Sequence, residues 1–197
     1  MTERPKQPRS RHKPDAGLPN ALWMVNSGAE AGAFRLAMRR IVGGVTVITT
    51  RHDDQPWGMT VSAFTPVCID PPTLLVSVNN RTVTAFAISR NGLFAVKFLS
   101  QARLNASRLC ARSGKDNHVV PPNELPDRVV MTVLRNSIVT FDCRATEIRP
   151  VGSHLVAIAT VEAVLAPEAR APLLYGEGQY FHGIAIDDRP AIEGVRA

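Results

Sequence analysis

The spacing of apolar residues predicts one helix near the start of the chain. Ser27 and Glu30 fit a helix capping box. Behind this box, apolar residues recur three or four positions apart, which is the spacing of one helix face. These residues are Phe34, Ala37, Met38 and Ile41. The glycine pair Gly43-Gly44 is expected to end the helix, because glycine is common just beyond a helix C-terminus.

After the glycine pair, β-branched residues and alternating apolar positions predict a series of strands. The expected strands cover residues 45–50, 57–69, 73–78, 93–99, 129–133, 138–148 and 154–165. Pro150-Val151-Gly152 joins the last two of these into a large antiparallel hairpin, and a smaller closing hairpin follows over residues 173–181.

Short helices interrupt the strands. Asn79-Asn80-Arg81-Thr82 provides capping groups for a helix over residues 83–89, which Asn91-Gly92 ends. Residues 101–112 are expected to form another helix with Leu104 and Leu109 facing inward. The proline-containing segment 114–127 reads as a long loop, and loops of that length in compact domains are often functional.

Six to eight strands with two to four short helices, and no strict β-α-β alternation, favour a mainly β fold with flanking helices. The expected architecture is a closed or nearly closed antiparallel β-barrel with the helices packed outside. Residues 1–25 are expected to be a basic disordered tail, 26–186 one domain, and 187–197 a loose C-terminal tail.

Composition and charge narrow the class of protein. The chain has 197 residues, 45% of them hydrophobic and 20% charged, which is ordinary for a soluble globular domain. Half of the net charge of +6 lies in residues 1–20, so a basic globular face for nucleic acid is weakly supported. No apolar run is long enough to span a bilayer. Three widely spaced cysteines indicate reduced thiols in a cytoplasmic protein.

Several common catalytic patterns are absent from the sequence. It contains no P-loop, no dinucleotide-binding G-x-G-x-x-G, no H-E-x-x-H and no clustered metal ligands. The G-x-S-x-G elbow of serine hydrolases is also missing. The sequence therefore gives little support to nucleotide hydrolysis, zinc chemistry or serine-based hydrolysis.

The stretch from Gly58 to Pro72 carries the most distinctive pattern, G-M-T-V-S-A-F-T-P-V-C-I-D-P-P. Small and hydroxylated residues along a strand leave backbone groups open to a flat ligand with a polar edge. On the residues alone the stretch is equally a half-exposed strand, and Asp70 is a turn-forming residue before proline. The other candidate side chains also have simple structural explanations. Thr82 can be a helix cap, Lys97 a snorkelling strand residue, His154 a strand opener and Tyr180 an aromatic core residue.

This stretch resembles the signature strand and turn of flavin reductase-like proteins, which have the FMN-binding split-barrel fold. They include the reductase components of two-component flavin monooxygenases. The resemblance extends from about Phe34 to about Tyr180 in matching order. It implies an antiparallel split β-barrel and a site for a flavin, FMN or FAD.

The resemblance also implies roles for individual residues. Thr60, Val61, Ser62 and Ala63 would lie along the edge of the isoalloxazine ring, mainly through backbone groups. Asp70 matches the acidic turn, and Asn80, Thr82 and Thr84 match the segment that binds the ribityl chain and phosphate, where hydroxyls beside a helix N-terminus favour an anion. Lys97 stands where the family usually has asparagine. His154, in Gly-Ser-His where the family has Gly-Asp-His, would lie on the nicotinamide side, and Tyr180 would approach the same site.

The function implied is that of an NAD(P)H-dependent flavin reductase. Hydride would pass from nicotinamide C4 to flavin N5, with NADH or NADPH as the co-substrate, and a homodimer and a partner monooxygenase are implied as well. Three other interpretations stay open. One is a flavin-binding sensor or carrier without turnover, which two departures support, Ser153 and the pair Asn117-His118. The others are another split-barrel oxidoreductase with a pyridoxamine-phosphate or deazaflavin-type ligand, and a nucleic-acid-binding module using the basic tail.

Overall fold

The computed structural model describes residues 31–112, 136–167 and 170–183. The expected tails, the Ser27 capping box, the 114–127 loop with Asn117-His118 and the 129–133 strand therefore lie outside the described residues. By its internal packing the chain divides into two units, Met1–Met38 and Arg39–Ala197. All of the strands belong to the second unit.

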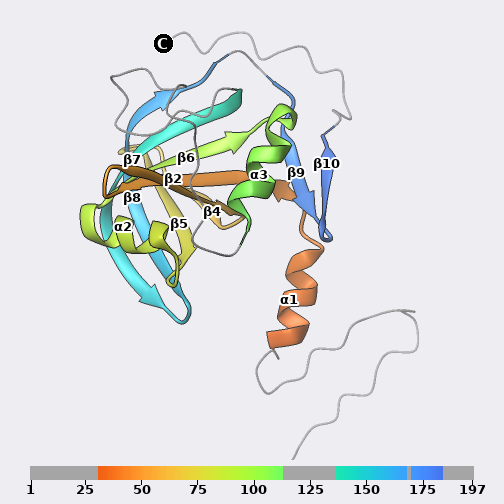
Figure 1. Ribbon diagram of the computed structural model, residues 1–197, viewed down its shortest axis with the longest axis horizontal. Helices are drawn as coiled ribbons and strands as arrows, with labels where there is room; N and C mark the ends of the chain where they lie inside the picture. Colours follow the sequence, from red (N-terminus) through yellow and green to blue (C-terminus); the bar gives the residue numbers. More distant parts are fainter. Residues whose placement is uncertain (1–30, 113–135, 168–169, 184–197) are drawn as a thin grey trace, which may run out of the picture. The chain divides into compact units, whose positions relative to one another are not determined.

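A seven-stranded antiparallel sheet forms most of the second unit, with its strands in the order β3-β2-β6-β7-β8-β5-β4 (Figure 1). Its strands are β2 (Thr46–His52), β3 (Gln55–Val61), β4 (Phe64–Cys68), β5 (Thr73–Asn79), β6 (Leu93–Leu99), β7 (Ser137–Val151) and β8 (His154–Leu165). The long β7–β8 hairpin, whose formation was predicted, lies near the centre of this sheet. Apolar side chains on one face of these strands, among them Ile48, Val76, Phe94, Val96 and Ala157, form the main buried core.

The two outer strands of this sheet, β3 and β4, are joined by only two residues, Ser62 and Ala63. Three peptide steps from Val61 to Phe64 span at most about 11 Å. The opposite edges of the sheet must therefore curl toward each other at this joint, and a hydrogen bond from the Ser77 amide to the Ala63 carbonyl, 3.1 Å, secures it. This is the split-barrel arrangement that the resemblance implied.

A second, three-stranded sheet pairs β1 (Gly43–Gly44) with β9 (Leu173–Gly176), and β9 with β10 (Gln179–His182). The Val45 amide donates to the Leu173 carbonyl and the Leu99 amide to the Val45 carbonyl. These bonds attach the small sheet to β6 of the large sheet. A second buried cluster of Val45, Val47, Leu99, Cys110 and Leu173 lies between them.

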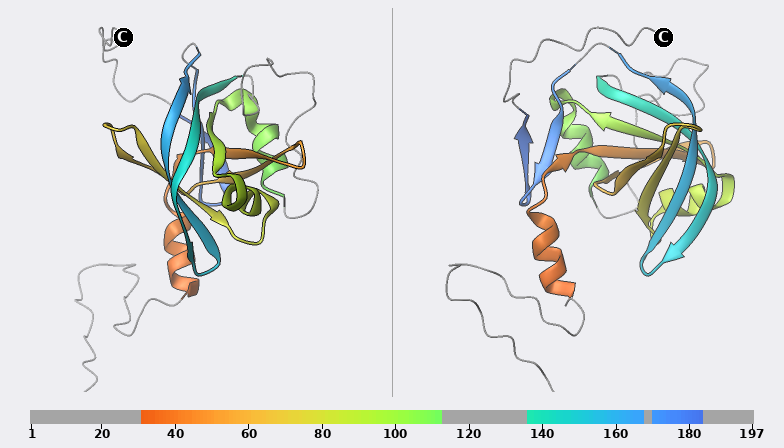
Figure 2. Two further views of the ribbon diagram at one scale, coloured as in Figure 1. Left: turned by 90° about the vertical axis from the view of Figure 1, so that its left-hand side faces the viewer. Right: turned by 180° about the vertical axis from the view of Figure 1, so that it is seen from behind.

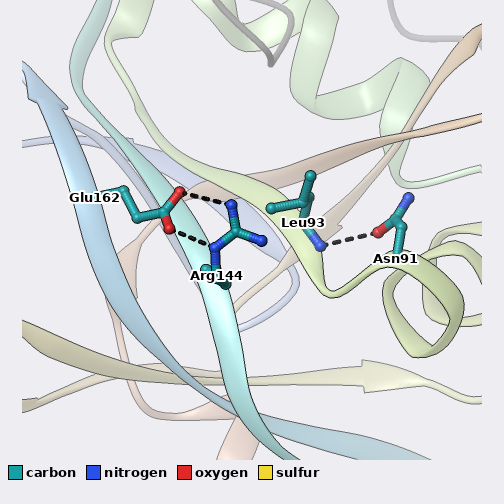
Figure 3. Close-up of polar contacts among 4 residues, drawn as sticks. All are labelled: Asn91, Leu93, Arg144 and Glu162. Carbon is teal, nitrogen blue, oxygen red and sulfur yellow. Dashed lines mark hydrogen bonds and ion pairs between the residues drawn. The ribbon is translucent and has the colours of Figure 1, made fainter.

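The helices are α1 (Ala31–Arg39), α2 (Val83–Asn91) and α3 (Leu104–Cys110), the last preceded by a 3-10 turn, Gln101–Arg103. Helix α2 begins and ends as predicted: the Thr82 hydroxyl accepts from the Ala85 amide, and Gly92 ends the helix in the left-handed conformation. The Asn91 side chain accepts a hydrogen bond from the Leu93 amide, which leads the chain into β6 (Figure 3). The two turned views in Figure 2 show α3 beside β6 and the small sheet.

Four expectations about the elements were wrong in detail. Helix α1 ends at Arg39, before the glycine pair, which forms β1 by pairing with Leu174 and Tyr175. Residues 57–69 are two strands on opposite sheet edges. Leu109 is 40% exposed, and Ser107 and Cys110 are the buried residues of α3. The described residues contain ten strands, more than the six to eight expected. Within them, no helix has the length and apolar character needed to cross a membrane.

Candidate functional site

A pocket of about 250 Å³ lies where the end of β3 meets helix α3 and the small sheet. It brings together four residues singled out from the sequence: Thr60, Val61, Ser62 and, from a distant strand, Tyr180. The remaining lining residues are Gly43, Gly44, Val45, Ser107, Ala111 and Tyr175. The sequence did not single these out, because the pairing of β1 with β9 and the packing of α3 on β3 are long-range contacts.

A short chain of hydrogen bonds holds the walls of this pocket together. The Thr60 hydroxyl donates to the Ser107 carbonyl across 2.8 Å. The Ser107 hydroxyl lies 2.9 Å from the Tyr180 hydroxyl. Strand β3, helix α3 and strand β10 are thus connected through one buried serine. Ser107 could have been noticed as a polar residue on the inward face of a predicted helix, but the tyrosine that it contacts lies 73 positions away.

Tyr180 is also fixed by its neighbours. The Tyr175 ring packs against it edge-on with centroids 5.0 Å apart, and the Arg108 guanidinium carbon lies 5.7 Å from its ring centroid. A cation over a tyrosine ring is attracted to the electron-rich face. Tyr180 is therefore held by its hydroxyl and by its ring.

The Ser62-Ala63 joint carries free backbone donors; Ser62 lines the pocket, and Ala63 follows it in the chain without being one of the lining residues. In the described part of the chain the Ser62 carbonyl accepts from the Phe64 amide and the Ala63 carbonyl from the Ser77 amide, whereas the two amides of Ser62 and Ala63 have no acceptor. Both residues are exposed. Unpaired amides beside a pocket suit the acceptor edge of a flat heteroaromatic ring, and the isoalloxazine of a flavin has such an edge. The residues present therefore fit a flavin.

A second group of predicted residues gathers where β5 and β8 meet. Register pairs Asn79 with His154. The Asn80 amide donates to the Ser153 carbonyl at 3.1 Å, and the Asn80 side chain reaches the Gly152 carbonyl at 3.4 Å. Ser153 stands where an acid was expected from the resemblance, and its hydroxyl lies 3.0 Å from His154 Nδ1. An exposed histidine is thus oriented by a neutral partner.

The three residues predicted to contact the phosphate differ in whether their side chains are available to a ligand. The Thr82 hydroxyl is occupied as the cap of α2 and also donates to the Asn79 carbonyl at 2.8 Å. Thr84 is only 2% exposed. Asn80 is exposed and has side-chain capacity left, so it is the best placed of the three to meet a ligand.

Asp70 lies in the turn between β4 and β5, on the exposed side of the chain and before a cis peptide bond to Pro71. Its carbonyl accepts from the Cys68 thiol, with Sγ and O 3.0 Å apart. The structure therefore places Asp70 in a turn and does not include it among the residues that line the pocket.

Lys97 is completely buried in the middle of β6. Its ammonium donates to the Thr49 hydroxyl on β2. Burial lowers the pKa of Lys97 to about 7, against the opposing attraction of Asp142. Burial in turn raises the pKa of Asp142, although Lys97 counteracts it, and one oxygen of that carboxyl, Oδ1, has no hydrogen-bond partner among the described residues.

Two further charges lie near Asp142. Glu162 on β8 also raises the pKa of Asp142, and Arg144 holds Glu162 in a two-pronged contact, with Nε and Oε1 2.5 Å apart (Figure 3). Lys97 is therefore part of a polar cluster, and none of the members of this cluster lines the pocket. We call Lys97, Thr49 and Asp142 the lysine cluster. Among the described residues no group of three or more histidine, cysteine or acidic side chains could hold a metal ion.

Comparisons with known proteins agree with this geometry. The family model described as the flavin reductase like domain matches residues 38–183. An FMN reductase (NADH) of Methylorubrum extorquens is 36% identical over 152 residues, which cover 77% of this chain and 76% of that protein. The reductase component of the FADH(2)-dependent resorcinol hydroxylase of a Rhizobium species is 35% identical over 176 residues, covering 83% and 94%. The styrene monooxygenase flavin reductase of Pseudomonas putida superposes with a TM-score of 0.68 at 25% identity, covering 77% and 98%.

Proposed function

Because this chain belongs to the flavin reductase-like family, we propose that it is an NADH-dependent flavin reductase whose flavin ring lies in the pocket beside Ser62 and Ala63. The observation that carries this proposal is the pair of free amides at the joint between β3 and β4. When bound, the flavin supplies the ring that accepts hydride and the nicotinamide nucleotide supplies the hydride.

The residues of the chain bind and orient. The two amides would donate to the acceptor edge of the ring, and fixed donors of this kind stabilise negative charge that develops on reduction without having to reorganise. The Thr60–Ser107–Tyr180 hydrogen bonds hold the pocket walls in place. Asn80, with the N-terminus of α2 behind Thr82, is the proposed contact for the ribityl phosphate.

His154 is the proposed contact for the nicotinamide side. Its Nδ1 is engaged by Ser153, which leaves Nε2 directed elsewhere on an exposed ring. His154 would orient the nucleotide through this nitrogen. NADH is the proposed donor because the Methylorubrum relative is named for it. The choice between FMN and FAD is left to measurement, since the two relatives named above differ in it.

The proposed biological role is to supply reduced flavin to an oxygenase partner, as the names of the resorcinol hydroxylase and styrene monooxygenase components describe for those proteins. The proposed location is the cytoplasm, which suits the three free cysteines.

A homodimer is also proposed. Tyr175, which is 43% exposed, lines the pocket, and Val42, which is 47% exposed, lies against Gly176, the residue after Tyr175, so a second copy would cover an apolar rim. Analytical ultracentrifugation of the purified chain should give twice the monomer mass, and a mass equal to that of the monomer would contradict the dimer.

The first experiment is oxidation of NADH and NADPH by purified protein under low oxygen, with and without FMN or FAD. Rapid NADH oxidation coupled to flavin bleaching is the expected result. In His154→Ala, the KM for NADH should rise about tenfold while flavin affinity is kept. Bound flavin without turnover would contradict a reductase and favour a flavin-binding carrier. Failure to bind any flavin would remove the proposed site itself.

A further inference from the structure

A second pocket adjoins the first and shares Tyr180 with it. Its volume is about 560 Å³, and it lies between helix α3 and the β9–β10 hairpin. Leu104, Leu173 and Phe181 supply apolar walls, and Arg108, Gln179 and His182 are among its polar groups. Nothing in the reaction proposed above uses this pocket when the flavin is FMN.

The charged side chains described around this pocket are basic. None of its lining residues is acidic. Arg108 contributes a guanidinium held over Tyr180. A second guanidinium, that of Arg39, reaches the hairpin turn, where its Nη2 lies 2.8 Å from the position that a Cβ on Gly178 would take. Gly178 lines the pocket and has a positive φ of 81°, so a side chain there would be strained and would displace Arg39.

Both guanidinium groups are available to an anion. Within the described ranges neither Arg39 nor Arg108 forms an ion pair with a carboxylate. Glu177 lies in the same turn, but only its backbone is engaged there, its amide donating to the Arg39 carbonyl, and it does not line the pocket. Arginine pairs readily with phosphate through two parallel hydrogen bonds.

We propose that this second pocket binds the adenosine diphosphate half of a dinucleotide. The pyrophosphate would meet Arg108 and Arg39, and the adenine would lie against Leu104 and Phe181. For FAD this means that the ribityl phosphate, which is part of the pyrophosphate, would lie at these arginines and not at Asn80. A dinucleotide needs two adjoining pockets, one for its reactive ring and one for its adenosine end, and Tyr180 lines both pockets here. FAD and NADH carry the same adenosine diphosphate half. The inference rests on the proposed function, since that function supplies the dinucleotide.

The test is titration calorimetry of the full chain with ADP. Saturable binding is expected, with a dissociation constant about tenfold higher in Arg108→Gln, because one charge-assisted contact is lost. Arg108→Lys should recover part of that loss because the positive charge is kept. The matched control is Arg90→Gln, which removes an exposed arginine from the last turn of α2 and should bind ADP as the unaltered chain does.

Competition on the unaltered chain identifies the source of the ADP half and needs no variant. If ADP weakens the binding of FAD but not of FMN, the pocket serves FAD. If it weakens the binding of NADH but not of FAD, the pocket serves NADH. The proposal is overturned if ADP fails to bind at millimolar concentration, if it competes with neither dinucleotide, or if Arg108→Gln binds it as tightly as the unaltered chain.

FMN-dependent NADH oxidation separates the two hypotheses. Turnover with FMN in a chain that does not bind ADP would contradict the second pocket alone. ADP binding in a chain without NADH oxidation would support the pocket and contradict the reductase.

Discussion

The first pocket, where flavin is proposed to bind, and the lysine cluster lie on the same face of the same sheet and have opposite physical character. Register places Thr60, Val47 and Lys97 side by side on β3, β2 and β6. Thr60 lies at the sheet edge, where the chain leaves the ladder and two amides remain free. Lys97 lies two strands further in and is fully buried, and its ammonium donates to Thr49 and is attracted by Asp142. Position in the sheet, more than residue type, decides which polar group can meet a ligand.

The largest expected effect concerns the lysine cluster and its dependence on pH. Lys97 has a pKa of about 7 in the folded chain, against the ordinary lysine value of 10.5, so the unfolded chain binds more protons between these values. Stability should therefore rise with pH by about 1.4 kcal/mol per unit. Burial raises the pKa of the Cys110 and Cys143 thiols from 9.0 to about 11 and about 12, which reverses the trend above pH 9.

Denaturant unfolding between pH 7 and 9 measures this effect. The unaltered chain should gain about 2 kcal/mol over those two units, because Lys97 is already half deprotonated in the folded chain at pH 7, and Lys97→Met should lose that gain. A gain of the same size in Lys97→Met would show that Lys97 is not the group that titrates. Because the lysine cluster does not line the pocket, the same change in pH should alter the free energy of flavin binding less than the free energy of unfolding in both chains.

The next effect concerns the joint. Ala63→Pro removes one free amide and keeps the carbonyl that accepts from Ser77. Flavin affinity should fall about tenfold, because one donor to the ring edge is lost. Ala63→Gly is the matched control: it keeps the amide and should bind flavin nearly as the unaltered chain does. Fluorescence quenching of added flavin gives both values, and equal binding by the proline variant would exclude this amide as a ligand.

The smallest effect concerns the contact that joins the pocket walls. Tyr180→Phe and Ser107→Ala each remove one side of the hydroxyl pair and should cost about 1 kcal/mol of unfolding free energy. In the double variant the costs should not add, with a coupling energy of about 1 kcal/mol. Additive costs would mean that the two hydroxyls do not stabilise each other.

Much of the fold followed from local signals. Thr82 and Gly92 delimit α2 because capping depends on neighbouring residues, and the limits of β6 and β8 were clear from apolar runs. The glycine pair and the stretch 57–69 were misread because their structure depends on distant partners. Gly43-Gly44 is a strand only because β9 lies beside it, and Val61 and Phe64 belong to opposite edges only because the sheet curls.

The candidate site divides in the same way. Thr60, Val61 and Ser62 are consecutive and were predicted, like Tyr180, from the resemblance, and all four line one pocket. Ser107 and Tyr175 enter the pocket through packing between elements far apart in sequence, which no local pattern records. Lys97 was predicted as a possible ligand contact, and its burial depends on the strands on both sides of it.

The two-residue joint makes ligand capture a reporter of correct assembly. Ser62 and Ala63 occupy their positions only when β3 and β4 are both paired at their own edges, so a chain that has formed one edge and not the other presents no complete binding edge. A ligand bound there favours the closed sheet over every partly assembled form by mass action. If the flavin binds at these two peptide units as proposed, assembly of the barrel and binding of its ligand depend on the same contacts.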